Sequence, residues 1–171
     1  MGKINKIIII TSIFLYTNIV FSQDASEINE IFKKIELLIE HDRRIIDKKV
    51  HITIYNRPKP KSSEIFVRTL DADDDFKHWV SITPDYTIKI SKSECKNIEE
   101  QILSMDFNTF VKLNNRIGMH GYKCQLTYGD MMSSISLNAW KPTSKTEERQ
   151  LQAYLKVCNM ILEKAEMGVL E

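Results

Sequence analysis

The sequence has few of the residues from which common catalytic loops are built. It contains five glycines, one of them Gly2. It has no Gly-x-Ser-x-Gly, no glycine-rich phosphate loop and no dinucleotide fingerprint. Its four histidines are scattered, without a His-x-x-x-His or Glu-x-x-His pair, so a helical metalloprotease site is unsupported. No motif therefore defines a reaction, and calcium, discussed below, is the one cofactor that the sequence suggests.

The sequence also has few cysteines and almost no net charge. The three cysteines are Cys95, Cys124 and Cys158, and their spacing fits no zinc pattern. In an oxidising compartment one disulfide can form, Cys95–Cys124 being one of three pairings; alternatively all three thiols are buried as small apolar residues. Basic and acidic residues nearly balance, with a formal net charge of +1. Nucleic-acid binding usually requires a basic surplus, so we expect no nucleic-acid partner.

The first 22 residues have the three parts of a secretory signal peptide. Lys3 and Lys6 precede an apolar run over residues 7–21, and small or modest residues follow up to Ser22. A membrane-spanning helix needs about 20 mostly apolar residues, and this run is shorter and interrupted by polar ones. We therefore predict cleavage between Ser22 and Gln23, export to the periplasm or the cell exterior, and no membrane span afterwards. The mature chain, 23–171, is predicted to be a single domain.

Hydrophobic periodicity predicts helices at both ends of this domain. Near the start, one stripe has helical spacing: it consists of Ile28, Ile31, Phe32, Ile35, Leu38 and Ile39. Near the end, Ser144 to Glu147 has the pattern of a capping box. A stripe from Leu151 through Cys158 to Ala165 follows, with Gly168 as a stop. Two further helices are predicted over 93–103 and 106–116.

Alternating or short apolar segments predict the strands. They cover residues 49–55, 64–70, 76–83 and 86–91, and then a hairpin of 122–128 and 131–140 around Gly129-Asp130. The predicted fold class is α+β, with an antiparallel sheet of about five to six strands. An N-terminal helix, one or two middle helices and a long C-terminal helix pack on it.

Two clusters suggest chemistry. Asp71, Asp73 and Asp75 lie in an acidic run whose carboxylates could converge on Ca²⁺. The EF-hand pattern fails there, however, and a solvated loop is the simpler interpretation. His120 and Cys124 are four residues apart and could form a nucleophile and its base, although no local signature of a cysteine hydrolase surrounds Cys124.

Polar and aromatic residues of the predicted hairpin suggest a binding surface. Trp140 and Asn138, together with Tyr128 and Asp130, are the candidate binding residues, because Trp and Tyr supply contact area at small entropic cost. The alternative is that Trp140 packs under the C-terminal helix. Glu99 and Glu100 are interpreted as a solvated helix face.

The C-terminal third contains Tyr122-Lys123-Cys124, Tyr128-Gly129-Asp130 and Trp140-Lys141-Pro142, followed by the apolar helical stripe. In these features it resembles small exported proteins of Bacteroidota. The resemblance implies an exported protein with a hairpin and a helix, and it implies no catalytic residue.

Together these observations favour a non-catalytic binding or interaction protein of the immunity, inhibitor or ligand-binding type, with an unknown protein or small ligand as partner. The alternative is a small exported hydrolase with a Cys/His or carboxylate site.

Overall fold

The computed structural model describes residues 33–41, 48–56, 62–72, 78–114, 118, 121–130 and 132–170. The predicted signal peptide, its cleavage site at Ser22–Gln23 and the domain boundary there lie outside these ranges, as do Asp73, Asp75 and His120. The described helices do not include one with the length and apolar character needed to cross a membrane.

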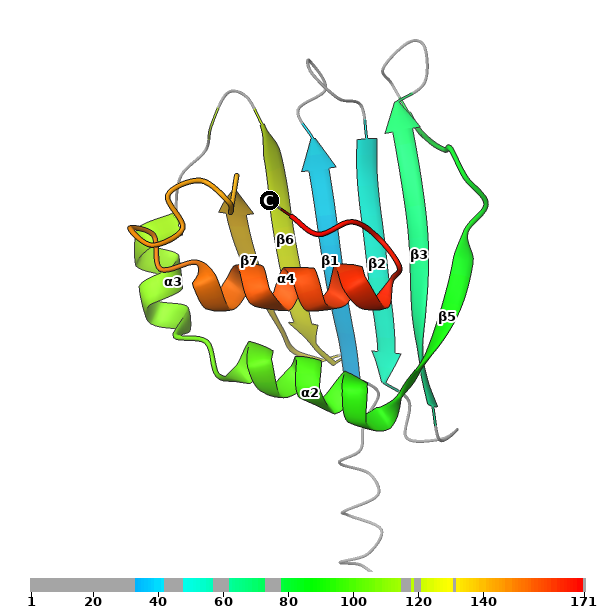
Figure 1. The fold of residues 1–171 in the computed structure, drawn as a ribbon, viewed down its shortest axis with the longest axis horizontal. Coiled ribbons are helices and arrows are strands. Elements are labelled where there is room, and N and C mark those ends of the chain that lie inside the picture. Colours follow the sequence, from blue (N-terminus) through cyan, green and yellow to red (C-terminus); the bar gives the residue numbers. More distant parts are fainter. Residues whose placement is uncertain are drawn as a thin grey trace, which may run out of the picture. The chain divides into compact units, whose positions relative to one another are not determined.

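A seven-stranded antiparallel sheet forms one layer of the fold (Figure 1). Its strands are β1 (Lys33–His41), β2 (Lys48–Asn56), β3 (Ser62–Ala72), β4 (Trp79–Ser81), β5 (Tyr86–Ser91), β6 (Tyr122–Gly129) and β7 (Ser134–Trp140). They are ordered β4-β3-β2-β1-β6-β7, with β5 also paired to β3. The α+β class and the antiparallel sheet are therefore as predicted.

The central strand β1 corrects the prediction of an N-terminal helix, whose first part lies outside the described residues. Residues 33–41 pair with β2 on one side and β6 on the other. The buried residues are Ile35, Leu37 and Ile39, with exposures of 2%, 0% and 4%, so the period is two rather than 3.6. The local sequence fits both periods, and the neighbouring strands decide between them by pairing the backbone on both edges.

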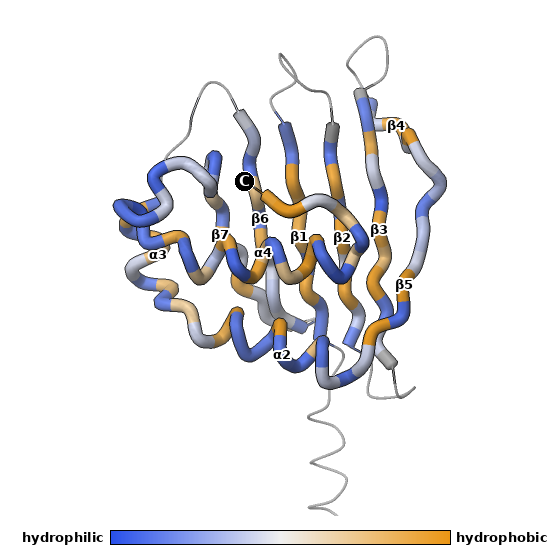
Figure 2. The backbone as a smooth tube through the Cα atoms, viewed as in Figure 1, coloured by the Kyte–Doolittle hydropathy of each residue, from blue (hydrophilic) through white to orange (hydrophobic). Residues whose placement is uncertain are grey.

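Within the described residues, three helices form the second layer: α2 (Lys92–Leu103), α3 (Phe107–Asn114) and α4 (Gln152–Lys164). Helices α2 and α4 cross the same face of the sheet (Figure 1). Hydrophobic residues recur along the strands beneath them and along α4 (Figure 2). Helix α2 starts with a capping box in which the Ser91 hydroxyl accepts from the Glu94 amide at 3.2 Å, and the Ser91 amide donates to the Glu94 carboxylate at 2.9 Å.

Helix α4 begins later than the predicted capping box at Ser144–Glu147. Residues 141–150 form turns instead, and Lys145 and Gln150 have positive φ angles of 55° and 51°, which a right-handed helix does not allow. The buried guanidinium of Arg149 stabilises these turns by donating to the carbonyls of Lys141 at 3.0 Å and Ser144 at 3.1 Å. The apolar stripe from 151 to 165 is otherwise buried as expected.

Candidate functional site

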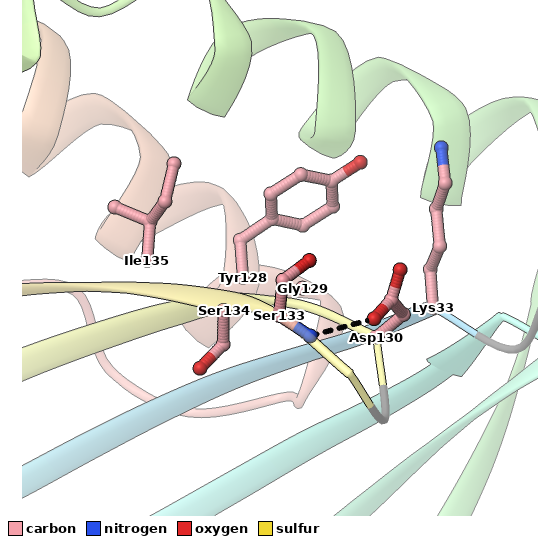
Figure 3. Close-up of a pocket in the computed structure, with 7 residues that line it drawn as sticks. All are labelled: Lys33, Tyr128, Gly129, Asp130, Ser133, Ser134 and Ile135. Carbon is pink, nitrogen blue, oxygen red and sulfur yellow. Dashed lines mark hydrogen bonds between the residues drawn. The ribbon is translucent and has the colours of Figure 1, made fainter.

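A pocket of about 200 Å³ lies beside the turn that joins β6 to β7 (Figure 3). Its lining residues are Lys33, Tyr128, Gly129, Asp130, Ser133, Ser134 and Ile135. They come from the start of β1, the end of β6, the connecting turn and the start of β7. Antiparallel pairing places these segments together, because Lys34 is opposite Gly129 and Gly129 is opposite Ser134.

The turn itself is held by the side chain of Asp130. One carboxylate oxygen accepts from the amides of Met132 at 2.7 Å and Ser133 at 2.9 Å, and the Asp130 amide donates to the Ser133 carbonyl at 2.8 Å. These backbone bonds lower the pKa of Asp130, because they stabilise the charged carboxylate. Gly129 is required here, since a Cβ atom would lie 2.2 Å from the Ser133 carbonyl oxygen.

Glu99 of α2 accepts hydrogen bonds from two of the residues that line the pocket. The Lys33 ammonium donates to Oε1 of Glu99 at 2.6 Å, and the Tyr128 hydroxyl donates to the same oxygen. The Lys33 ammonium also lies 5.9 Å from the centre of the Tyr128 ring. Figure 3 shows the Tyr128 hydroxyl and the Lys33 ammonium both directed towards the helix. Glu99 is 8% exposed, whereas the Lys33 side chain is 42% exposed. In this cluster, the Lys33–Glu99–Tyr128 cluster, the Glu99 side chain is therefore shielded from water and the ammonium is partly exposed.

Contacts within the cluster shift the pKa values of Lys33 and Tyr128. The hydrogen bond to Glu99 raises the pKa of Lys33, which favours the ammonium form. Burial, followed by the hydrogen bond to Glu99, raises the pKa of Tyr128 and favours the neutral phenol. The Lys33 ammonium and the neutral Tyr128 phenol both donate to Oε1 of Glu99, and this arrangement fixes the Tyr128 ring as a wall of the pocket.

The four predicted binding residues are divided between two places. Tyr128 and Asp130 line the pocket. Asn138 alternates with the buried Leu137 and Ala139, so it lies on the face of the sheet opposite the helices. Trp140 lies on that face too, and its indole packs against Gly118. A Cβ atom on residue 118 would lie only 1.9 Å from Nε1 of Trp140. Trp140 therefore does not pack under α4.

Sequence reasoning missed Lys33 and Glu99. Glu100 is on a solvated face as expected, with its carboxylate 3.6 Å from the Lys96 ammonium, whereas Glu99 is buried. The spacing of residues along α2 indicates that Glu99 is buried. The buried residues of this helix are Cys95, Ile98, Glu99 and Ile102. Glu99 is thus part of an i, i+3, i+4, i+7 stripe, and a carboxylate in such a stripe needs buried partners.

The predicted nucleophile Cys124 is inaccessible. Cys95, Cys124 and Cys158 are free thiols with 0% exposure, so no disulfide joins Cys95 to Cys124. Burial raises the pKa of Cys124 far above its ordinary value and raises that of Cys158 to about 12. A nucleophilic cysteine needs an accessible thiolate, so this environment contradicts catalysis by Cys124.

The predicted calcium ligands are not brought together within the described residues. Asp71 lies in β3 opposite Val80, while Asp73 and Asp75 are outside the described ranges. Over residues 33–170, apart from the gaps given above, there is no group of three or more His, Cys, Asp or Glu side chains arranged to hold a metal ion. Calcium binding by the acidic run stays a prediction.

A second polar group lies on the face of the sheet opposite α2 and α4. His51 Nε2 is 3.1 Å from Oε1 of Glu36 and 3.3 Å from Oγ1 of Thr53. A carboxylate–histidine–hydroxyl relay needs the two partners on different ring nitrogens, whereas here both contact Nε2. The Thr53 hydroxyl is also on a residue that is only 2% exposed. This group therefore stabilises the pairing of β1 with β2 and does not activate a nucleophile.

Comparison with known proteins gives a partial similarity. The sequence matches no family model. It is 30% identical over 111 residues to ATP synthase subunit delta of Bartonella henselae, and the match covers 56% of this chain and 55% of that protein. The chain thus spans about half the length of the curated protein it matches.

Proposed function

We propose that this chain is an exported, non-catalytic binding protein and that the pocket beside the β6–β7 turn binds a small ligand. One observation supports the ligand site above all: the hydrogen bonds of the Lys33–Glu99–Tyr128 cluster fix the Tyr128 ring that forms a wall of the pocket. A wall that is ordered beforehand binds more tightly, because the ligand does not have to order it.

The size and lining of the pocket restrict the ligand. Its volume of about 200 Å³ corresponds to roughly six or seven water molecules at ~30 Å³ each. Tyr128 and Ile135 provide apolar surface, and the hydroxyls of Ser133 and Ser134 with the carboxylate of Asp130 provide hydrogen-bonding groups. This combination suits a small organic molecule with a flat apolar body and one polar group, such as a phenol.

The experiment uses p-cresol as a probe and backbone amide NMR shifts as the readout. We expect the shifts to concentrate on Gly129, Asp130 and residues 133–135. Ile135→Trp should abolish them by filling the pocket. Ile82→Trp is the matched control, because Ile82 is exposed to a similar degree (46% against 43%) and does not line the pocket. Shifts that are spread over the protein, or that persist in the Ile135→Trp variant, would contradict a ligand site here.

A further inference from the structure

Strand β7 is the last strand at one end of the sheet order, next to β6 (Figure 1). An edge strand presents unpaired backbone N–H and C=O groups and therefore accepts another strand unless something prevents it. Proteins usually prevent this with charged residues, proline or a very short strand. The other end of the sheet has such protection, because β4 has three residues and β5 contains the exposed Lys89.

The β7 edge has none of the sequence protections. Residues 132–140 contain no charged residue and no proline. Ser134, Ile135 and Ser136 are exposed, and the apolar side chains of Ile135 and of the neighbouring Met132 are 43% and 93% exposed. Helix α3 packs near this strand, and among the described residues no strand besides β6 pairs with β7. We propose that β7 pairs antiparallel with β7 of a second copy of this chain.

The strand is complementary to itself in one register. With a two-fold axis at Ser136, Ser136 faces its own copy and Ser134 faces Asn138, so polar residues meet on the face opposite α2 and α4. On the other face Ile135 meets Leu137. Such a pairing is isologous and closes as a dimer.

The charges next to the strand favour the same orientation. Asp130 precedes β7 and Lys141 follows it, and both lie outside the uncharged segment. Antiparallel pairing brings the acidic end of one copy beside the basic end of the other. No like charges face each other across the strand. This match distinguishes a second copy from an unrelated extended peptide, whose charges would be arbitrary.

Sedimentation of the purified protein tests the proposal. We expect a dimer that Ser136→Lys converts to a monomer, because the two introduced ammonium groups face each other at the axis. Thr87→Lys is the matched control: Thr87 is an exposed strand residue in β5, at the other end of the sheet, and this variant should stay dimeric. A monomer at every concentration of the unmodified protein, or an unchanged dimer of Ser136→Lys, would overturn the proposal.

Cross-linking provides a second measurement if Ser136→Lys does not fold. A disulfide needs Cα atoms about 4.4–6.8 Å apart, which strand pairing at the axis permits. Ser136→Cys should therefore form a covalent dimer on mild oxidation, and Thr87→Cys should not. The native cysteines do not interfere, because all three are buried. Failure of Ser136→Cys to cross-link refutes this register. Ile135 belongs to both the pocket and the proposed strand pair. Neither dimer test uses p-cresol or changes a residue that lines the pocket, so a failure of the dimer can be told apart from a failure of the ligand site.

Discussion

The bond between Tyr128 and Glu99 should be measurable as a coupling free energy. Tyr128→Phe removes the hydroxyl that donates to Glu99 and keeps the ring that lines the pocket. Glu99→Gln removes the negative charge and nearly keeps the shape of the side chain. The double variant completes a thermodynamic cycle, from which the interaction between the two side chains is obtained.

The magnitude follows from the burial of Glu99. A hydrogen bond to a charged group contributes about 1.5–3 kcal/mol to the free energy of unfolding. Glu99 keeps the Lys33 ammonium after the change at Tyr128, so we expect a loss of about 2 kcal/mol for Tyr128→Phe. For a chain of this size that lowers Tm by roughly 4–8 °C. The coupling between Tyr128 and Glu99 should be about 1–2 kcal/mol.

Urea unfolding at neutral pH of the unmodified protein, the two single variants and the double variant gives these values. The control cycle replaces Tyr128→Phe with Tyr122→Phe. Tyr122 lies at the other end of β6, and its hydroxyl is 3.0 Å from that of Thr143. Because its partner is unrelated to Glu99, its effect should add to that of Glu99→Gln. A coupling near zero for Tyr128 and Glu99 would refute the argument that Glu99 holds the pocket wall.

Two further predictions concern the thiols and export. The pKa of Cys158 is about 12 in the folded protein and 9.0 ordinarily. Because the pKa of this thiol is higher in the folded protein than in the unfolded one, the contribution of the protonated thiol to the free energy of unfolding is complete below pH 9. It is lost as pH rises towards 12, by about 1.4 kcal/mol per pH unit. Urea unfolding under reducing conditions should show this decline, and Cys158→Ala should reduce its slope; equal slopes would contradict a buried thiol. Mass spectrometry of the protein from its native host should show a chain that begins at Gln23, whereas an intact Met1 would contradict export.

Local patterns were sufficient for several elements. Alternation identified β2 and the hairpin β6–β7, and the helical stripe identified most of α4, because each of these segments buries one face against a single layer. The start of α4 could not be read in the same way. The Ser144–Glu147 pattern is compatible with a helix start, but Arg149 binds the carbonyls of Lys141 and Ser144 and keeps the segment in turns.

The candidate site was predictable only in part. The sequence singles out Tyr128 and Asp130 as aromatic and polar residues of the predicted hairpin, and both line the pocket. Lys33 and Glu99 are 66 positions apart in the chain. No local pattern indicates that they share a hydrogen bond.

By itself the sequence determined the α+β class, the hairpin and the near-neutral charge, since these depend on composition and on periods of two and 3.6 residues. Only the tertiary structure decided that residues 33–41 form a strand, that the three thiols are buried and unpaired, and that Glu99 reaches Lys33 and Tyr128. Each of these outcomes depends on partners distant in the chain, and distant partners override local preference when they satisfy backbone groups or buried charges.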